Sequence, residues 1–247
     1  MYVELLAHTQ LSRVFKERLA AALAALNEAG VKPTDGQVVA LSAIRNCYSA
    51  TEPTAIFNKE YRKYFERQAT DGGTGSEAER LFRQIVRSGH LSTMEHLSFT
   101  FAIEGVSRAL LAQLTRHRVG FSFSVESQRY TRLGTRDKSG GFDYVTPPSV
   151  RAAGAEAEAA FHEAMRFAQQ SYDVLRSGGV PPEDSRSVLP NAAVTHIVMT
   201  ANFRALLDFY SKRKPGSGAQ WEIADLAERL RAAVVAVEPW TDPFFDQ

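Results

Sequence analysis

The sequence predicts an α+β fold that is mostly helical, with a central sheet that is antiparallel or mixed. Segments with apolar residues at helical spacing outnumber segments in which apolar and polar residues alternate. The strand-like segments also do not alternate evenly with helices, as the parallel sheet of a βαβ protein requires. No internal repeat and no clear linker divides the 247 residues, so we expect a single domain over residues 1–247.

The first part of the chain is expected to form one strand and three helices. In order, these are a strand at residues 1–6, a helix at 11–27 ended by Gly30, a helix that begins at Asp35, and a helix between Ser76 and Gly89. Ser76 and Glu79 have the spacing of a capping box, in which each side chain accepts the other residue's free backbone N–H. A glycine such as Gly89 commonly ends a helix. The cluster of Gly, Ser and Thr at 70–76 predicts a loop.

The rest of the chain is expected to form three more strands and four more helices. Residues 97–104 and 121–126 alternate between apolar and polar side chains, the pattern of half-buried strands. The remaining elements are a helix at 107–115, a long helix at 150–175 closed by Gly178 and Gly179, a buried strand at 194–200, a helix from Asn202 to Arg213 and a last helix at 219–237.

The composition is that of an ordinary globular protein. Hydrophobic residues make up 44% and charged residues 23%, with a formal net charge of +1, which excludes a disordered chain and a basic tail protein. No apolar run reaches the roughly 18 residues of a membrane span, and residues 1–30 lack the pattern of a signal peptide. Cys47 is the only cysteine, which excludes an internal disulfide and a zinc site rich in thiolates. We therefore expect a soluble cytoplasmic protein without a general affinity for nucleic acid.

The near-neutral total hides a basic segment between Arg108 and Arg136. It holds six arginines, no lysine and one acid, Glu126, for a local net charge of +5. Arginine without lysine favours bidentate binding of phosphate or carboxylate groups. A solvated basic face, a nucleic-acid site and a protein interface are alternatives. A compact cluster in a neutral chain fits a small ligand with several negative charges best.

Several blocks along the chain resemble one enzyme family. Arg116-His117-Arg118, followed by Ser127-Gln128-Arg129-Tyr130, is similar to the signature of the flavin-dependent thymidylate synthases. Supporting blocks occur in the same order as in that family, at residues 89–96, 186–190, 202–204 and 219–223. The resemblance spans about residues 40–230.

The resemblance implies an enzyme that methylates deoxyuridylate (dUMP) to thymidylate (dTMP). Methylenetetrahydrofolate would be the one-carbon donor, and FAD reduced by NADPH would supply the hydride. It also implies a homotetramer whose active sites lie where subunits meet. Two alternatives stay open: another FAD- or nucleotide-binding oxidoreductase, and a nucleic-acid-binding module that uses the basic segment.

The resemblance also implies roles for individual residues. The residues that match FAD contacts are His90, Ser92, Arg116, His117, Arg118, Glu126, Asn202, Phe203, Arg204 and Asp208. The residues that match dUMP contacts are Gln113, Leu114, Thr115, Arg116, Glu126, Ser127, Gln128, Arg129, Arg186 and Arg213. Arg213 is the implied catalytic residue, because a guanidinium that polarises the uracil ring would stabilise its developing negative charge.

Simpler interpretations remain for some of these residues. Asn202 has the identity of a helix N-cap, Arg204 and Asp208 have the spacing of a surface ion pair on one helix, and a cation at Arg213 suits a helix C-terminus. The histidines and the glutamate of residues 90–96 lack the spacing of a zinc site, so no metal is expected.

The sequence departs from the common family pattern at three places. One extra residue lies between Arg118 and Ser127. Val125 stands where Gln or Glu is frequent in the family, and we expect neighbouring Glu126 to take over the polar contact of that residue. Asp208 stands where Asn or His is frequent. Two interpretations of Cys47 stay open, a nucleophile and a buried packing residue. Free cysteines are usually buried packing residues, and the resemblance implies that no cysteine nucleophile is needed.

Overall fold

The computed structural model describes residues 1–246 and contains two compact units. The first unit comprises residues 1–4, 102–118 and 123–199. The second unit comprises residues 5–101, 119–122 and the chain from Thr200 onward. The expectation of one domain stays a prediction.

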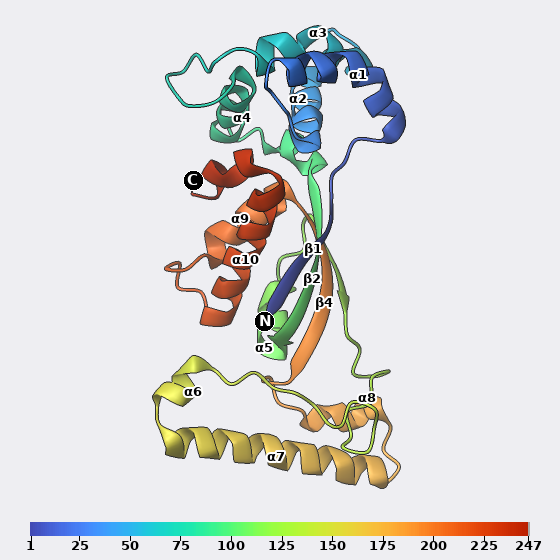
Figure 1. Cartoon of the computed structure of the whole chain (residues 1–247). Helices are drawn as coiled ribbons and strands as arrows, with labels where there is room; N and C mark the ends of the chain where they lie inside the picture. The colour runs from blue at the N-terminus through green and yellow to red at the C-terminus, as the bar shows by residue number, and fades with distance from the viewer. Residues whose placement is uncertain (247) are drawn as a thin grey trace. The chain divides into compact units, whose positions relative to one another are not determined.

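The strands form one antiparallel sheet, as the α+β prediction allowed (Figure 1). Its order is β1-β2-β4-β3, where β1 is Tyr2–His8, β2 is Ser98–Ser107, β3 is Phe121–Val125 and β4 is Val194–Asn202. Along β4, buried Ile197 and Met199 alternate with exposed His196 and Val198. The strand predicted at 194–200 is therefore present, but its prediction as a buried strand holds for one face of β4 only.

The second unit is mainly helical. Its helices are α1 (Arg13–Glu28), α2 (Asp35–Tyr48), α3 (Pro53–Phe65), α4 (Glu77–Arg87), α9 (Phe203–Arg213), α10 (Trp221–Val237) and α11 (Asp242–Phe245), with short 3-10 turns η1 (Leu91–His96) and η3 (Pro239–Thr241). Phe57, Phe82, Phe99 and Phe203 lie at its centre, each at most 1% exposed. The helix predicted at 219–237 is present, but it is not the last, because η3 and α11 follow it.

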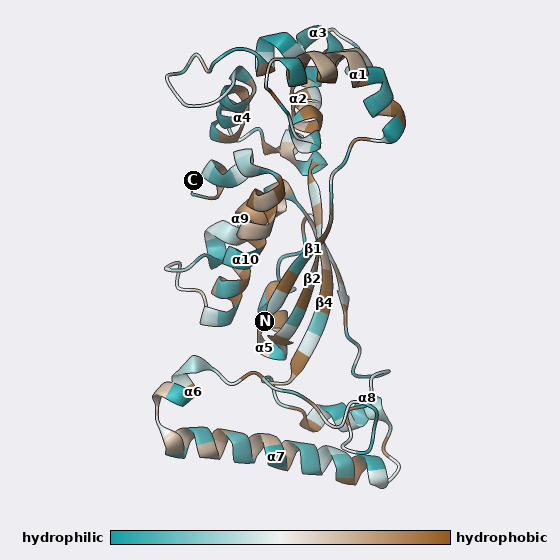
Figure 2. Ribbon diagram, in the orientation of Figure 1, coloured by the Kyte–Doolittle hydropathy of each residue, from teal (hydrophilic) through white to brown (hydrophobic). Residues whose placement is uncertain are grey.

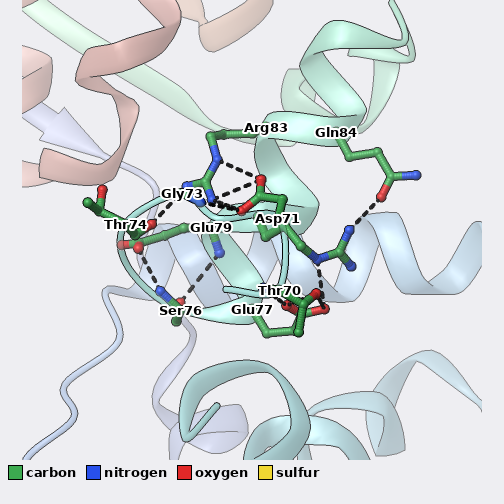
Figure 3. Close-up of polar contacts among 10 residues, drawn as sticks. Thr70, Asp71, Gly73, Thr74, Ser76, Glu77, Glu79, Arg83 and Gln84 are labelled. Atoms are coloured by element: carbon green, nitrogen blue, oxygen red, sulfur yellow. Dashed lines mark hydrogen bonds and ion pairs between the residues drawn. The ribbon is translucent and has the colours of Figure 1, made fainter. Parts of the chain in front are cut away.

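The loop at residues 70–76 is held against the start of α4 by polar contacts (Figure 3). The Ser76 amide donates to Glu79 at 2.9 Å and the Glu79 amide donates to Ser76 at 3.4 Å, which confirms the predicted capping box. Asp71 pairs with Arg83 at 2.9 Å, and this hydrogen bond lowers the pKa of the Asp71 carboxyl. The loop is therefore well anchored despite its glycines.

The first unit contains α5 (Arg108–Leu114), α6 (Pro148–Ala152), α7 (Ala155–Ser177), α8 (Pro182–Ser185) and the 3-10 turn η2 (Arg186–Val188). The prediction of one helix at 150–175 is wrong, because the helix is interrupted between α6 and α7. Gly154 lies at the break with a φ of 101°, which no right-handed helix accommodates. Hydrophobic and hydrophilic residues are mixed along α7 (Figure 2), and its Phe167 and Val174 are 67% and 72% exposed.

Within residues 1–246, no helix is both long and apolar enough to cross a membrane.

Candidate functional site

A pocket of about 540 Å³ lies in the second unit, beside the first turns of α9. Three residues predicted from the sequence to contact a cofactor line it together: Asn202, Arg204 and Asp208. The other lining residues are Val86, Leu91, Glu95, Val119, Ala205, Leu207, Ser211 and Phe244. Its volume falls in the range of small-molecule sites, about 300–1,000 Å³.

Asn202 is fixed at the edge of this pocket by two backbone contacts. Its Oδ1 accepts the Ala205 amide at 2.8 Å, which confirms that it is the N-cap of α9. Its own amide donates to the Gly120 carbonyl at 3.0 Å. Gly120 has a φ of 76°, and a Cβ there would lie 2.7 Å from Asn202 Nδ2. Only glycine therefore lets the chain after Arg118 pass this close to the Asn202 side chain.

The charged side chains that line the pocket all take part in ion pairs, and Arg204 and Asp208 do not pair with each other. Arg204 Nη1 pairs with Glu95 Oε1 at 2.6 Å, and Asp208 pairs with Lys212 at 2.8 Å. The interpretation of Arg204 and Asp208 as a simple ion pair within α9 is therefore wrong. Both pairs are half exposed, and such pairs contribute only about 0–1 kcal/mol. A ligand that offers comparable contacts can thus replace them at little cost.

Phe203 also lies at the start of α9, but its side chain faces the core and is 0% exposed. Its amide donates to the Leu97 carbonyl at 2.8 Å. The contact with FAD that the resemblance implies for Phe203 therefore cannot come from its ring.

His90 and Ser92 flank the start of η1 in the same unit. His90 Nδ1 lies 2.8 Å from the Tyr48 hydroxyl, which fixes the orientation of the imidazole ring. Ser92 lines a different pocket, of about 610 Å³, together with His96 and Cys47. Cys47 is exposed, so its interpretation as a buried packing residue is wrong. No three His, Cys, Asp or Glu side chains gather as a metal site anywhere in residues 1–246.

Arg213 is half-buried in the last turn of α9. From Phe203 to Arg213 the helix rises about 15 Å, at about 1.5 Å per residue. Arg213 and Asn202 thus mark opposite ends of one helix in the second unit.

The predicted dUMP residues at the end of α5 lie in the first unit. Gln113 Nε2 donates to the Ala109 carbonyl at 3.3 Å, and Thr115 Oγ1 donates to the Leu111 carbonyl at 2.9 Å. The Leu114 side chain is 0% exposed, so any ligand contact of this residue comes from its backbone. In the Arg-His-Arg triplet that follows, Arg116 and Arg118 are exposed and His117 is half-buried.

The loop with Glu126, Ser127, Gln128 and Arg129 is tied to α5 by Arg108. Arg108 Nη2 donates to the Glu126 carbonyl at 2.9 Å. Burial lowers the pKa of the Arg108 guanidinium, and the positive charge of Arg186 lowers it further, while Glu126 opposes both effects. Arg108 Nε and Gln128 Nε2 are buried and find no hydrogen-bond partner among residues 1–246. Unpartnered buried donors are costly, and they fit a site that is completed by an acceptor on a ligand.

Two of the predicted dUMP arginines meet at one glutamate. Arg129 Nε pairs with the Glu183 carboxylate at 2.5 Å, and Arg186 Nε donates to the Glu183 carbonyl at 2.9 Å. The structure therefore brings Arg129 and Arg186 together, although they are far apart in the sequence. Sequence reasoning missed Glu183, because no pattern around it marks it as a partner of Arg129.

The first unit gathers arginines and unpartnered buried donors, and the second holds a pocket with charged and amide side chains at a helix N-terminus. Both are features of a protein that binds anionic, nucleotide-like ligands. The chain matches the sequence profile of the thymidylate synthase complementing protein family over residues 31–240. It is 42% identical over 166 residues to the flavin-dependent thymidylate synthase of Geobacter sulfurreducens, covering 67% of this chain and 68% of that protein. It is 39% identical over 198 residues to that of Halobacterium salinarum, covering 72% and 79%.

The chain therefore belongs to the flavin-dependent thymidylate synthase family, and the family and enzyme class predicted from the sequence are confirmed. Solved structures with less similar sequences share the fold. The UMP/dUMP methylase PolB from Streptomyces cacaoi, 23% identical, has a TM-score of 0.69, with 99% of this chain and 94% of that one covered. A flavin-dependent thymidylate synthase from Helicobacter pylori, 22% identical, has a TM-score of 0.64, with 99% and 98% covered.

Proposed function

We propose that this chain catalyses the reductive methylation of dUMP to dTMP, with FAD as its cofactor. Methylenetetrahydrofolate is the one-carbon donor and NADPH is the reductant. The carbon arrives as a methylene group and the hydride completes the methyl group, so the products are dTMP, tetrahydrofolate and NADP⁺. Family membership supports the activity, and the observation that carries the cofactor assignment is the pocket shared by Asn202, Arg204 and Asp208.

FAD, when bound, supplies the redox chemistry, and the residues of the second unit are expected to hold it. Asn202 offers an amide, and Arg204 offers a cation that only an exposed ion pair occupies. His90, Ser92, Phe203 and Asp208 complete this set. We assign Arg116, His117, Arg118 and Glu126 to FAD as well, from the family motif.

The arginines of the first unit are expected to hold the phosphate of dUMP. Arg129 pairs with the Glu183 carboxylate, and Arg186 donates to the backbone carbonyl of the same residue, so the two guanidinium groups lie close together. The same pair suits a phosphate, which accepts bidentate hydrogen bonds from guanidinium groups. Arg116 and the residues Gln113, Leu114, Thr115, Glu126, Ser127 and Gln128 complete the proposed dUMP set.

Arg213 is proposed to polarise the uracil ring. A guanidinium that donates to the ring stabilises the negative charge that develops as C5 and C6 react. We therefore expect Arg213→Ala to abolish formation of dTMP while FAD remains bound. Normal turnover by this variant contradicts the assignment.

We also propose that the chain is a single-domain subunit of a homotetramer in the cytoplasm. α7 supports assembly, because only two of its 23 residues, Met165 and Tyr172, are buried. Its exposed Phe167 and Val174 are available to a second copy of the chain.

The proposed function is tested with the purified protein, FAD, dUMP, methylenetetrahydrofolate and NADPH. We expect dTMP to form only when all components are present. A protein that takes up FAD and oxidises NADPH without forming dTMP is instead a different flavin oxidoreductase. One that binds DNA or RNA with steep salt dependence and takes up no FAD is a nucleic-acid-binding module.

A further inference from the structure

The C-terminal segment, residues 238–245, forms part of the wall of the 540 Å³ pocket. Phe244 lines this pocket with Asn202 and Arg204. Its ring packs edge-on against Phe203, with centroids 6.3 Å apart, and against Trp240, with centroids 6.0 Å apart. The shape of the pocket next to Asn202 therefore depends on what holds this segment in place.

Glu238 holds the segment on the N-terminus of α2. It is only 2% exposed, and its carboxylate accepts three hydrogen bonds. The donors are the Thr34 hydroxyl, the Gly36 amide at 3.2 Å and Trp240 Nε1 at 2.5 Å. A helix N-terminus carries free N–H groups and a partial positive charge, so a carboxylate is favoured there. Glu238 thus links the start of α2 directly to the indole ring that supports Phe244.

Gly36 shows how closely the carboxylate fits. A Cβ at this position would lie 2.3 Å from Glu238 Oε1 and 2.5 Å from Cδ. Its backbone conformation is that of an ordinary helix and does not itself demand glycine. The space taken by Glu238 is therefore the reason for glycine here.

A second anchor holds the end of the segment. Arg231 on α10 pairs with Asp242, the first residue of α11, at 2.6 Å. α11 has four residues, too few for a helix to be stable without tertiary contacts. Besides its own ring contacts, the position of Phe244 therefore depends on the contacts at residues 238 and 242.

We propose that Glu238 is a positioning residue for the flavin pocket. By binding the N-terminus of α2, it fixes Trp240 and Phe244, and with them the pocket wall beside Asn202. This inference rests on the proposed function, because it takes FAD to be the ligand of this pocket.

Two substitutions disturb the contact from opposite sides. Glu238→Gln removes the charge and one acceptor at nearly constant size, and Gly36→Ala pushes the carboxylate away. Ile44→Ala is the control, because Ile44 is a fully buried residue of the same helix. Trp240→Phe, which removes the indole donor together with part of the ring, serves if a stronger change prevents folding.

The measurement is FAD affinity by flavin fluorescence, at a temperature well below each variant's Tm, with Tm recorded separately. We expect Glu238→Gln, Gly36→Ala and Trp240→Phe to weaken FAD binding by about threefold to tenfold, as expected for disturbing about one hydrogen bond. Ile44→Ala should lower Tm and leave FAD affinity unchanged. Wild-type FAD affinity in the first three variants overturns the inference and leaves Glu238 a role in stability alone. A wild-type protein that takes up no FAD contradicts the proposed function itself.

Discussion

Asn202 gives the clearest separation between a structural and a cofactor-binding role. Its Oδ1 caps α9 through the Ala205 amide at 2.8 Å, and the same side chain lines the proposed FAD pocket. Asn202→Ala removes both functions. Asn202→Ser keeps a good N-cap, because serine caps helices about as well as asparagine, but it removes the amide group that we assign to FAD.

The two effects have different expected sizes. Loss of the cap in Asn202→Ala costs about 1 kcal/mol, within a range of about 0.5–2. For a chain of this length that lowers Tm by about 2–4 °C per kcal/mol. Loss of one hydrogen bond to FAD costs about 0.5–1.5 kcal/mol, which weakens binding by about twofold to tenfold. Asn202→Ser should show only the second effect.

The assay combines thermal unfolding of the FAD-free protein with a fluorescence titration of FAD. Unfolding is measured without FAD because a bound ligand raises Tm by itself. We expect Asn202→Ser to keep the wild-type Tm and to lose FAD affinity. If Asn202→Ser has both the wild-type Tm and the wild-type FAD affinity, Asn202 is a helix cap only, and its assignment to FAD is refuted.

Three further predictions follow from single positions. Gly120→Ala should weaken FAD binding, because its Cβ meets the Asn202 side chain. Gly216→Ala, at a similar positive φ of 83° but with open space around it, should lower the free energy of unfolding by about 1–2 kcal/mol and leave FAD binding unchanged, as denaturation and fluorescence titration will show. Burial and the Glu228 contact raise the pKa of Tyr210 to about 12, so its share of stability is present below about pH 10 and is lost between pH 10 and 12. Tyr210→Phe should make Tm fall less steeply with pH in that range. An unchanged slope means that ionisation of Tyr210 does not cause the loss of stability. Cys47→Ala should leave turnover largely intact, because the proposed reaction uses no cysteine nucleophile, whereas a folded, inactive variant contradicts a mechanism without a protein nucleophile.

The helix boundaries were predictable where a local signal marks them. Ser76 with Glu79 caps α4, and Asn202 caps α9, because these contacts form between residues three apart. Gly154 shows the limit of such reasoning. Glycine is tolerated inside a helix, so the pattern alone did not predict that a positive φ at this residue divides α6 from α7. α11 was missed for a different reason, since a four-residue helix depends on tertiary contacts.

In the candidate site, too, the sequence predicted what local motifs mark and missed what depends on tertiary contacts. The motifs identified the family and the residues at the start of α9, and the structure places Asn202, Arg204 and Asp208 on one pocket. The contact between Arg204 and Glu95 joins residues 109 positions apart, and Phe244 reaches the pocket only because the C-terminal segment folds back. Contacts of this kind depend on how distant segments pack, and periodicity along the chain carries no information about them.

The central claim, that this chain is a flavin enzyme acting on dUMP, is tested most directly by the absorbance of the flavin in the purified protein. FAD is added, reduced with NADPH, and then reoxidised in the presence of methylenetetrahydrofolate without oxygen, with and without dUMP. We expect the oxidised flavin bands to return only when dUMP is present, together with dTMP. Protein that takes up no FAD, or flavin that is reoxidised equally without dUMP, contradicts the account.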